Sequence, residues 1–297
     1  MKLRIGTRRS PLALAQAEEV RERLMILGAE AELVPMVTSG DRGATSDSTP
    51  AGRKGLFVSE IVRALRDGEV DLAVHSAKDL PAEDEEGVVL AAVPERASPL
   101  DVLVTREGEL RPGGVVGTSS LRRRAQLLRW RPDVTVSELR GNVDTRLRRL
   151  EEGAVDGVVV AAAGLLRLGV VPGHSAPMSI AEMVPAPGQG CLAVQARSGD
   201  RSTAELVAPL DHAESRWALQ AERSLTRLLG GGCALPLGAH AWLERGRVHL
   251  VAIVASPDGE RFLRAETEAP TPETAAEEAA QDLLDRGAGE ILQAVRG

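Results

Sequence analysis

Segments with the pattern of buried strands alternate with segments of helical periodicity, and this order constrains the fold more than any other feature of the chain. Residues 2–6 and 70–74 are predicted strands, and residues 12–27 carry a helical apolar pattern. Ser10 and Pro11, just before that helix, are a typical N-cap and first helical residue. Strands that alternate with helices predict an α/β fold with mainly parallel sheets.

A second block of the chain repeats this order. Residues 115–116, 134–139 and 155–161 are predicted strands, and residues 121–130 and 144–152 are predicted helices between them. Another strand, over residues 32–37, completes the first block. The sequence therefore predicts two lobes of similar construction.

Short matches relate the two blocks to each other. Ile5-Gly6-Thr7 in the first block matches Val116-Gly117-Thr118 in the second. Val70-Asp71-Leu72-Ala73-Val74 in the first block likewise matches Val155-Asp156-Gly157-Val158-Val159 in the second. In the second match Lys78 and Asp79 fall opposite Ala163 and Gly164. The lobes are thus expected to share a scaffold, with the charged pair present only in the first.

The length of 297 residues predicts two or three domains. Residues 191–195 form a predicted strand that returns to the first lobe, which gives two linkers between the lobes and a hinge. Domain 3 is predicted as a small α+β unit with a helix over 211–229, strands over 239–243 and 248–255, and a terminal helix over 272–295. The predicted boundaries are residues 1–95 plus 190–208 for domain 1, 96–189 for domain 2 and 209–297 for domain 3.

A long polar segment separates two elements of the first lobe. Residues 38–55 are rich in Gly, Ser, Thr and Asp and have no apolar period, and a helix is predicted over residues 57–65. A loop of this length inside a compact domain is typical of a lid or a binding loop.

Charge and composition exclude several classes of protein. The net charge is −7 and aromatic residues make up 2%, which argues against nucleic-acid binding. No stretch approaches the ~18 apolar residues of a membrane span, and the first residues lack the apolar region of an export signal. Two cysteines without a Cys/His cluster predict a cytoplasmic protein with no metal site. With no large apolar patch in view, a monomer is expected.

Arginines gather at three predicted helix N-termini: Gly6-Thr7-Arg8-Arg9-Ser10, Thr118-Ser119-Ser120-Leu121-Arg122-Arg123-Arg124 and Arg140-Gly141-Asn142-Val143-Asp144-Thr145-Arg146. Unpaired backbone N–H groups and the helix dipole make such ends binding sites for carboxylate or phosphate, and arginine adds bidentate hydrogen bonds. The alternative is that Arg122, Arg123 and Arg124 form a solvated helix face. Three such termini together favour a site for a polyanion.

Asp79 is the strongest candidate for a catalytic group. His75-Ser76-Ala77-Lys78-Asp79 follows a buried strand, where α/β proteins place functional residues. Lysine is scarce, since only Lys2, Lys54 and Lys78 occur among 36 lysines and arginines. An exposed Lys78–Asp79 ion pair and a hydrogen-bonded core His75 are the alternatives. Cys233 follows three glycines and is the candidate nucleophile, whereas Cys191 has the pattern of a buried residue.

Six segments carry a resemblance to a known family: Thr7-Arg8-Arg9-Ser10-Pro11-Leu12-Ala13, Lys54-Gly55-Leu56-Phe57, His75-Ser76-Ala77-Lys78-Asp79-Leu80-Pro81, Gly117-Thr118-Ser119-Ser120-Leu121-Arg122-Arg123, Arg140-Gly141-Asn142-Val143-Asp144-Thr145-Arg146-Leu147 and Gly231-Gly232-Cys233. In this order and spacing they resemble the porphobilinogen deaminases, also called hydroxymethylbilane synthases, over essentially the whole chain. Two departures are Ala77, where methionine is expected in many relatives, and the additional Gly230 before the cysteine turn.

The resemblance implies two lobes like those of periplasmic binding proteins, a small third domain and a cleft between the lobes. It implies a dipyrromethane cofactor joined to Cys233 by a thioether and made from the enzyme's own substrate. Four porphobilinogen molecules would be deaminated and coupled head to tail onto this primer, and hydrolysis would release hydroxymethylbilane. Asp79 would protonate the departing amine and stabilise the cation left behind.

The resemblance also implies the binding residues, because each pyrrole carries an acetate and a propionate. The implied cofactor ligands are Cys233, Ser76, Lys78, Asp79, Thr118, Ser120, Arg122, Arg123, Arg140 and Arg146. The implied substrate ligands are Arg8, Ser10, Gln16, Phe57, Arg146 and Arg167, and Lys54 and Phe57 would help to close the cleft. The alternative function is that of a two-lobed cytoplasmic binding protein that captures a small polycarboxylate without reacting with it.

Overall fold

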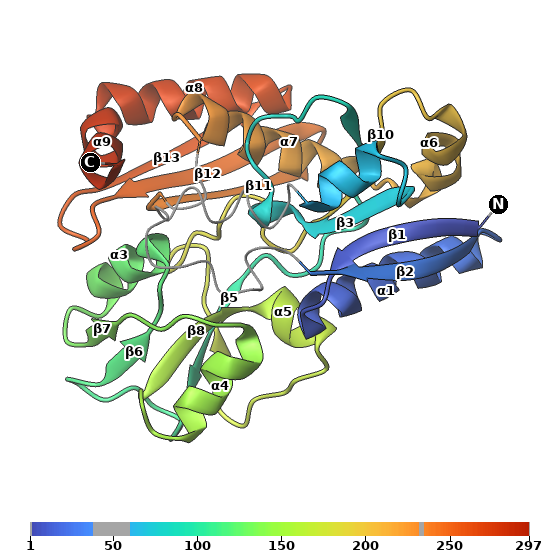
Figure 1. Cartoon of the computed structure of the whole chain (residues 1–297). Coiled ribbons are helices and arrows are strands. Elements are labelled where there is room, and N and C mark those ends of the chain that lie inside the picture. The colour runs from blue at the N-terminus through green and yellow to red at the C-terminus, as the bar shows by residue number, and fades with distance from the viewer. Residues whose placement is uncertain (1, 38–59, 232–234, 297) are drawn as a thin grey trace.

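A computed structural model describes residues 2–37, 60–231 and 235–296. In these ranges the chain forms two five-stranded sheets and one three-stranded sheet, and helices pack on each of them (Figure 1). The predicted loop over residues 38–55, Lys54, Phe57 and Cys233 lie outside the described residues, as does the start of the predicted helix over 57–65.

The first sheet has the strand order β2-β1-β3-β10-β4. Its strands are β1 (Lys2–Arg8), β2 (Glu30–Met36), β3 (Leu72–Ser76), β4 (Val88–Ala92) and β10 (Leu192–Arg197). Strand β1 is parallel to β2 and β3, whereas β10 is antiparallel to both of its neighbours. The strand predicted near residues 191–195 therefore returns to the first sheet, as expected.

Both faces of the first sheet are covered. Helix α1 (Pro11–Ile26) buries Val20 and Leu24 on one face, and helical residues 60–66 bury Ile61 and Leu65 on the other. A parallel sheet needs cover on both faces because its strands are apolar on both sides.

The second sheet has the order β7-β6-β8-β5-β9. Its strands are β5 (Asp101–Thr105), β6 (Val115–Gly117), β7 (Thr135–Ser137), β8 (Gly157–Ala161) and β9 (Ser175–Pro177). Its helices are α3 (Leu121–Trp130), α4 (Val143–Glu151) and α5 (Ala162–Arg167). Strand β5 is antiparallel to β8 and β9, so it takes the place that β10 takes in the first sheet. Each sheet is thus mainly parallel, with one reversed strand contributed by a segment that crosses between the lobes.

The strand register confirms the internal repeat. Gly6 pairs with Ala73 in the first sheet, and Gly117 pairs with Val158 in the second. The two aspartates of the repeat make the same contact. Asp71 Oδ2 accepts a hydrogen bond of 3.0 Å from the backbone N–H of Arg4, and Asp156 Oδ2 accepts one of 2.8 Å from Val115.

The third sheet is antiparallel and consists of β11 (Leu237–Glu244), β12 (Arg247–Ala255) and β13 (Phe262–Ala269). Helices α7 (Ala213–Leu228), α8 (Pro272–Asp285) and α9 (Ala288–Arg296) pack on one face of it (Figure 1). Strand β13 was not predicted. The single terminal helix predicted over 272–295 is wrong, because Gly287 at φ +91° separates α8 from α9. Two short elements, α6 (Arg201–Val207) and a 3₁₀ turn over Ala208–Leu210, precede α7.

A buried carboxylate joins the third sheet to the crossing segments. Glu222 of α7 is fully buried and accepts hydrogen bonds from Arg96 Nη1 at 2.7 Å, from Gly188 N at 2.5 Å and from Ala241 N at 2.8 Å. Two segments cross between the lobes: one joins β4 to β5 and contains Arg96, and the other joins β9 to β10 and contains Gly188. Ala241 lies in β11. One side chain therefore holds the third sheet against both crossings.

Candidate functional site

Two of the arginine-rich helix N-termini are capped by serine: Ser10, as the sequence predicts, and Ser120, which was not predicted as a cap. Ser10 Oγ accepts a hydrogen bond of 3.3 Å from Ala13 N at the start of α1, and Ser120 Oγ accepts one of 3.4 Å from Arg123 N at the start of α3. Both helices begin just after the carboxyl end of a parallel strand, at the edge of the sheet where α/β proteins bind ligands. Thr118 is buried beside the second cap, where its hydroxyl accepts from Ser120 N at 3.2 Å.

The arginine pair of α3 is buried on a single carboxylate. Asp101, at the first position of β5, receives Arg122 Nη1 at 2.7 Å and Arg123 Nη2 at 2.6 Å. The two guanidiniums also donate to backbone carbonyl oxygens, Arg122 to Val184 at 2.6 Å and Arg123 to Val159 at 2.8 Å. Arg122 is 3% exposed and Arg123 is 6% exposed. The solvated-face alternative is therefore wrong for these two residues.

Asp101 was not singled out in the sequence, although a lone carboxylate at the start of an apolar strand is an unusual feature. Burial alone would raise its pKa, but the guanidiniums of Arg122 and Arg123 hold the pKa of this carboxyl well below its usual range. Asp101 therefore stays ionised. Because one carboxylate faces two guanidiniums, the buried cluster keeps an excess of positive charge.

Arg146 adds a third positive charge beside this pair. Its Nε donates to the carbonyl oxygen of Gly141 at 2.9 Å, and it has no carboxylate partner in the described part of the chain. Burial, with the nearby charge of Arg123, lowers the pKa of Arg146 to about 10, so the side chain is a cation at neutral pH. Arg140 differs, because it lies in an exposed ion pair with Glu138 at 2.6 Å.

The turn after β3 carries the predicted catalytic group. Ala77–Asp79 forms a single 3₁₀ turn in which Lys78 and Asp79 are half-buried, and Ser76 ends the strand before it. Lys78 Nζ donates to Gln189 Oε1 at 3.4 Å. Arg8, half-buried at the end of the neighbouring strand β1, shares this edge of the sheet.

Residues from the second lobe reach α1 of the first. Arg167, at the end of α5, donates to Glu19 Oε2 at 2.9 Å and to the carbonyl oxygen of Gly190 at 3.2 Å, and its side chain is 6% exposed. Gln16 is buried one turn earlier in α1. Figure 1 shows α5 beside α1, where the two lobes approach each other.

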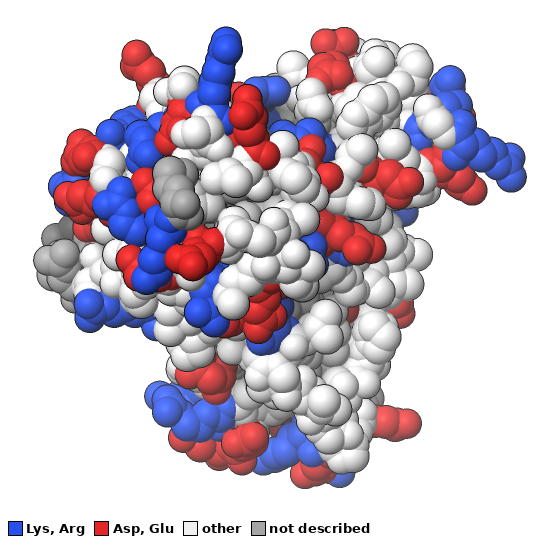
Figure 2. Space-filling model, turned by 90° about the vertical axis from the view of Figure 1, so that its right-hand side faces the viewer, with Lys and Arg blue, Asp and Glu red and all other residues white. Residues whose placement is uncertain are grey.

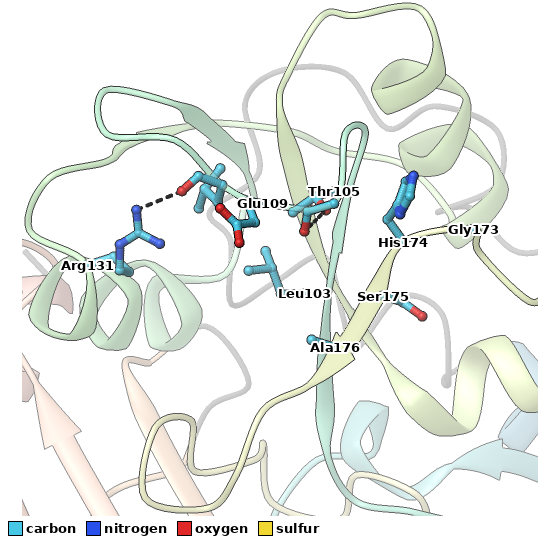
Figure 3. Close-up of a pocket in the computed structure, with 10 residues that line it drawn as sticks. Leu103, Thr105, Glu109, Arg131, Gly173, His174, Ser175 and Ala176 are labelled. Carbon is cyan, nitrogen blue, oxygen red and sulfur yellow. Dashed lines mark hydrogen bonds between the residues drawn. The ribbon is translucent and has the colours of Figure 1, made fainter.

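One hollow on the outer surface lies away from these residues. A depression of about 450 Å³ opens at the edge of the second sheet between β5 and β9, lined by Thr105, Glu109, Arg131 and His174 among others (Figure 3). None of the predicted site residues lines it. On the face drawn in Figure 2, acidic and basic side chains are interspersed, as the many ion pairs lead one to expect.

His75 lies next to the turn over Ala77–Asp79 as a buried, neutral imidazole. It is 6% exposed, and its Nε2 has no hydrogen-bond partner in the described ranges. His75 is therefore a core histidine, as the alternative held, but its Nε2 does not make the hydrogen bond that the alternative expected. Burial lowers the pKa of His75 to about 4; Asp79 opposes this shift and Arg8 adds to it.

This pKa predicts loss of stability in acid. The unfolded chain binds a proton at His75 near pH 6.5, whereas the folded chain does so only near pH 4, so stability falls as the pH drops through this window. Between pH 7 and pH 5 the protonation of His75 lowers the free energy of unfolding by about 2 kcal/mol. We expect His75→Asn to abolish this loss, as measured by urea unfolding at the two pH values. His174→Asn, at an exposed position, is the matched control. An unchanged acid sensitivity in His75→Asn would contradict the assignment.

The described residues were also searched for metal-binding clusters and for helices that could span a membrane. In the described ranges, no cluster of three or more His, Cys, Asp or Glu side chains has the arrangement of a metal site. No helix in the part of the chain that was searched is long and apolar enough to span a membrane.

Comparison with known proteins gives a consistent result along the chain. Residues 3–205 match the family model "Porphobilinogen deaminase, dipyromethane cofactor binding domain", and residues 217–286 match "Porphobilinogen deaminase, C-terminal domain". Porphobilinogen deaminases from Thiobacillus denitrificans and Syntrophotalea carbinolica are both 46% identical, over 99% of this chain and 98% and 96% of theirs. The relative from Desulforudis audaxviator is 47% identical over 98% of this chain and 97% of its own.

Solved structures with a related arrangement include a periplasmic substrate-binding protein from Coxiella burnetii, at 16% identity and a TM-score of 0.42 over 70% of this chain and 91% of that one. This similarity is too weak to bear on function. The family matches, by contrast, span both lobes and the third sheet at high identity. The chain belongs to the porphobilinogen deaminase family.

Proposed function

We propose that this chain condenses four porphobilinogen molecules, head to tail and with loss of ammonia, onto a dipyrromethane held by Cys233, and then releases hydroxymethylbilane. The observation that carries the proposal is the buried cluster in which, among the described residues, Asp101 is the one carboxylate that pairs with Arg122 and Arg123. A buried excess of positive charge is costly unless an anion compensates it. Family membership identifies the class of anion.

The residues fit a dipyrromethane. Each of its rings bears an acetate and a propionate, and guanidinium groups pair with carboxylates through two hydrogen bonds. Arg122, Arg123 and Arg146 bring three guanidiniums together against one protein carboxylate. When bound, the group would supply the free pyrrole carbon to which the first substrate is joined.

The side chains divide into two proposed sets. The cofactor would be held by Cys233, Ser76, Lys78, Asp79, Thr118, Ser120, Arg122, Arg123, Arg140 and Arg146, and the substrate would be bound by Arg8, Ser10, Gln16, Phe57, Arg146 and Arg167. Among the arginines of these sets that lie outside the Asp101 cluster, Arg140 pairs with Glu138 and Arg167 pairs with Glu19. A substrate carboxylate would have to replace those partners.

Asp79 is proposed as the acid and the counter-charge. A carboxyl group at the end of β3 can give a proton to the amine that leaves porphobilinogen, and the resulting carboxylate then faces the cation left on the substrate. Lys78 and the α3 cap bring positive charge and hydrogen-bond donors for the substrate's acid groups. Half-burial of the turn strengthens both effects because fewer waters screen the charges.

The domain boundaries predicted from the sequence are part of this proposal: 1–95 plus 190–208, 96–189, and 209–297. The order of strands supports them, because β10 joins the first sheet after the chain has crossed from the second. A monomer in the cytoplasm is likewise proposed. A free, buried Cys191 is compatible with a reducing compartment.

Product analysis tests the function directly. The purified protein is incubated with porphobilinogen, and released ammonia and tetrapyrrole are measured together. We expect four ammonia molecules for each hydroxymethylbilane. Binding of porphobilinogen without ammonia release would instead support the alternative of a two-lobed polycarboxylate-binding protein, which the family match does not favour.

Arg146 offers a test of the anion site. Replacing it by leucine removes a cation that has no carboxylate partner in the described ranges, so folding should be little affected. Loss of one charge-assisted interaction predicts a KM for porphobilinogen raised by about 10- to 100-fold, measured by initial rates. Arg148→Leu is the matched control on the same helix, because Arg148 is exposed and paired with Glu152. Equal kinetics in the two variants would remove Arg146 from the site.

A further inference from the structure

Gln189 lies at the centre of a buried polar bridge between the two lobes. Its side-chain Nε2 donates to the carbonyl oxygen of Pro99 at 2.7 Å and to Asp101 Oδ1 at 3.1 Å. Both partners are acceptors only, so the amide nitrogen must face them. The amide oxygen therefore faces Lys78, whose Nζ donates to it at 3.4 Å. Gln189 has no exposed surface.

The backbone around Gln189 is held as tightly as its side chain. Gly188 and Gly190 both have positive φ angles, of +74° and +90°. A Cβ at position 188 would lie 3.0 Å from the backbone N of Lys78, and one at position 190 would lie 2.3 Å from the carbonyl oxygen of Ala97. Only glycine permits such close approach at these angles. The segment is thus clamped between the catalytic turn and the first crossing.

Asp101 continues the bridge into the second lobe. The same Oδ1 that accepts from Gln189 also accepts from Arg123, and Oδ2 accepts from Arg122. Hydrogen bonds therefore run without a break from the arginine pair through Asp101 and Gln189 to Lys78. All members except Lys78 are buried, so water competes little for these bonds.

We propose that Gln189 is a positioning residue that ties Lys78, and with it the turn that carries Asp79, to the arginine pair on Asp101. A lysine side chain loses about 2 kcal/mol of rotamer freedom when it is ordered. A fixed acceptor at Gln189 confines Lys78 before the substrate arrives. The inference rests on the proposed function, because that function gives the Lys78–Asp79 turn its part in catalysis.

The first test reads Lys78 without any enzyme assay. Only three lysines occur, so the rate of reductive methylation at each can be followed by peptide mass spectrometry. We expect Gln189→Met to raise the rate at Lys78 by about threefold or more relative to Lys2, because an ammonium that loses an acceptor is freer to react. An unchanged ratio of the two rates would overturn the bridge.

A matched control is present in the second lobe. Gln126 is also buried, and its amide accepts from Val184 N at 2.7 Å and donates to Val184 O at 3.1 Å. Gln126→Met removes a comparable set of hydrogen bonds and should lower stability to a similar degree, yet leave the methylation rate at Lys78 unchanged. If both variants accelerate Lys78 equally, the effect is general loosening and the proposal fails.

The second test is a double-mutant cycle on porphobilinogen turnover. We expect Gln189→Met to lower kcat by about tenfold with KM changed less than about threefold, and to add less than about twofold in a Lys78→Met background. Multiplicative effects would show that Gln189 does not act through Lys78. An inactive wild-type chain would refute the proposed function. The methylation rates would still show whether Gln189 holds Lys78 in place.

A second variant, Gln189→Asn, keeps the proposal testable if Gln189→Met does not fold. Gln189→Asn keeps a buried amide but cannot reach Asp101 and Lys78 together. We expect the same rise in Lys78 methylation as in Gln189→Met. A methylation rate equal to that of the wild type would again overturn the proposal.

Discussion

Cys233→Ala is expected to lose both a covalent adduct of two linked pyrroles and nearly all turnover of porphobilinogen. The thioether needs a thiol at this position, and alanine offers no nucleophile. Intact-mass spectrometry of the purified wild-type chain should show the adduct, and the variant should show the mass of the bare polypeptide. Ammonia release from porphobilinogen should fall by at least about 100-fold.

The second cysteine supplies the control. Cys191 is fully buried beside Arg96 and Glu222, and burial raises the pKa of its thiol to about 11. A protonated, enclosed thiol is a poor nucleophile. Cys191→Ala should therefore keep the adduct. An unmodified mass in the folded wild type, or an adduct that survives in Cys233→Ala, would refute attachment at Cys233.

Asp79→Asn is expected to give a folded chain that turns over porphobilinogen about 100- to 10,000-fold more slowly, as general acid catalysis contributes on this scale. Asparagine keeps the size of the side chain but can neither donate a carboxyl proton nor carry the counter-charge. Ammonia release measures the effect, and circular dichroism confirms the fold.

A neighbouring carboxylate separates this role from a general effect of charge. Asp84 is exposed and pairs with Arg223 at 3.0 Å, five residues after Asp79. Asp84→Asn removes the same charge close to the same turn and should leave turnover within about twofold. Near-normal ammonia release in Asp79→Asn, or an equal loss in both variants, would argue against Asp79 as the acid.

Much of the fold could be predicted because it depends on local rules. Helix α3 begins and ends at the predicted residues, since Ser120 is a capping residue and the apolar period continues to Trp130. The repeat of Asp71 and Asp156 predicted two equivalent sheets, and the register bears this out. Prediction failed at β13, because this strand is polar and lacks a clear apolar pattern. It also failed at the break between α8 and α9, because the helical apolar pattern continues across the glycine that separates the two helices.

The candidate site was predicted only in part. Sequence motifs identified the arginines, Lys78 and Asp79, because these residues occur at strand ends and helix caps that can be recognised locally. They did not show that Arg122 and Arg123 are buried on Asp101, 21 and 22 residues away, or that Gln189 reaches Asp101 across 88 residues. Such contacts depend on which strands become neighbours.

The sequence by itself therefore determined the alternation of strands and helices, the repeat, and which charged residues stand at the ends of elements. Hydrophobic period and capping act over a few residues, so they are visible in the chain. The tertiary structure decided which of those charges compensate each other. Strand β5 and the segment that leads into β10 bring Asp101 and Gln189 between the lobes, and in that arrangement two arginines share one carboxylate.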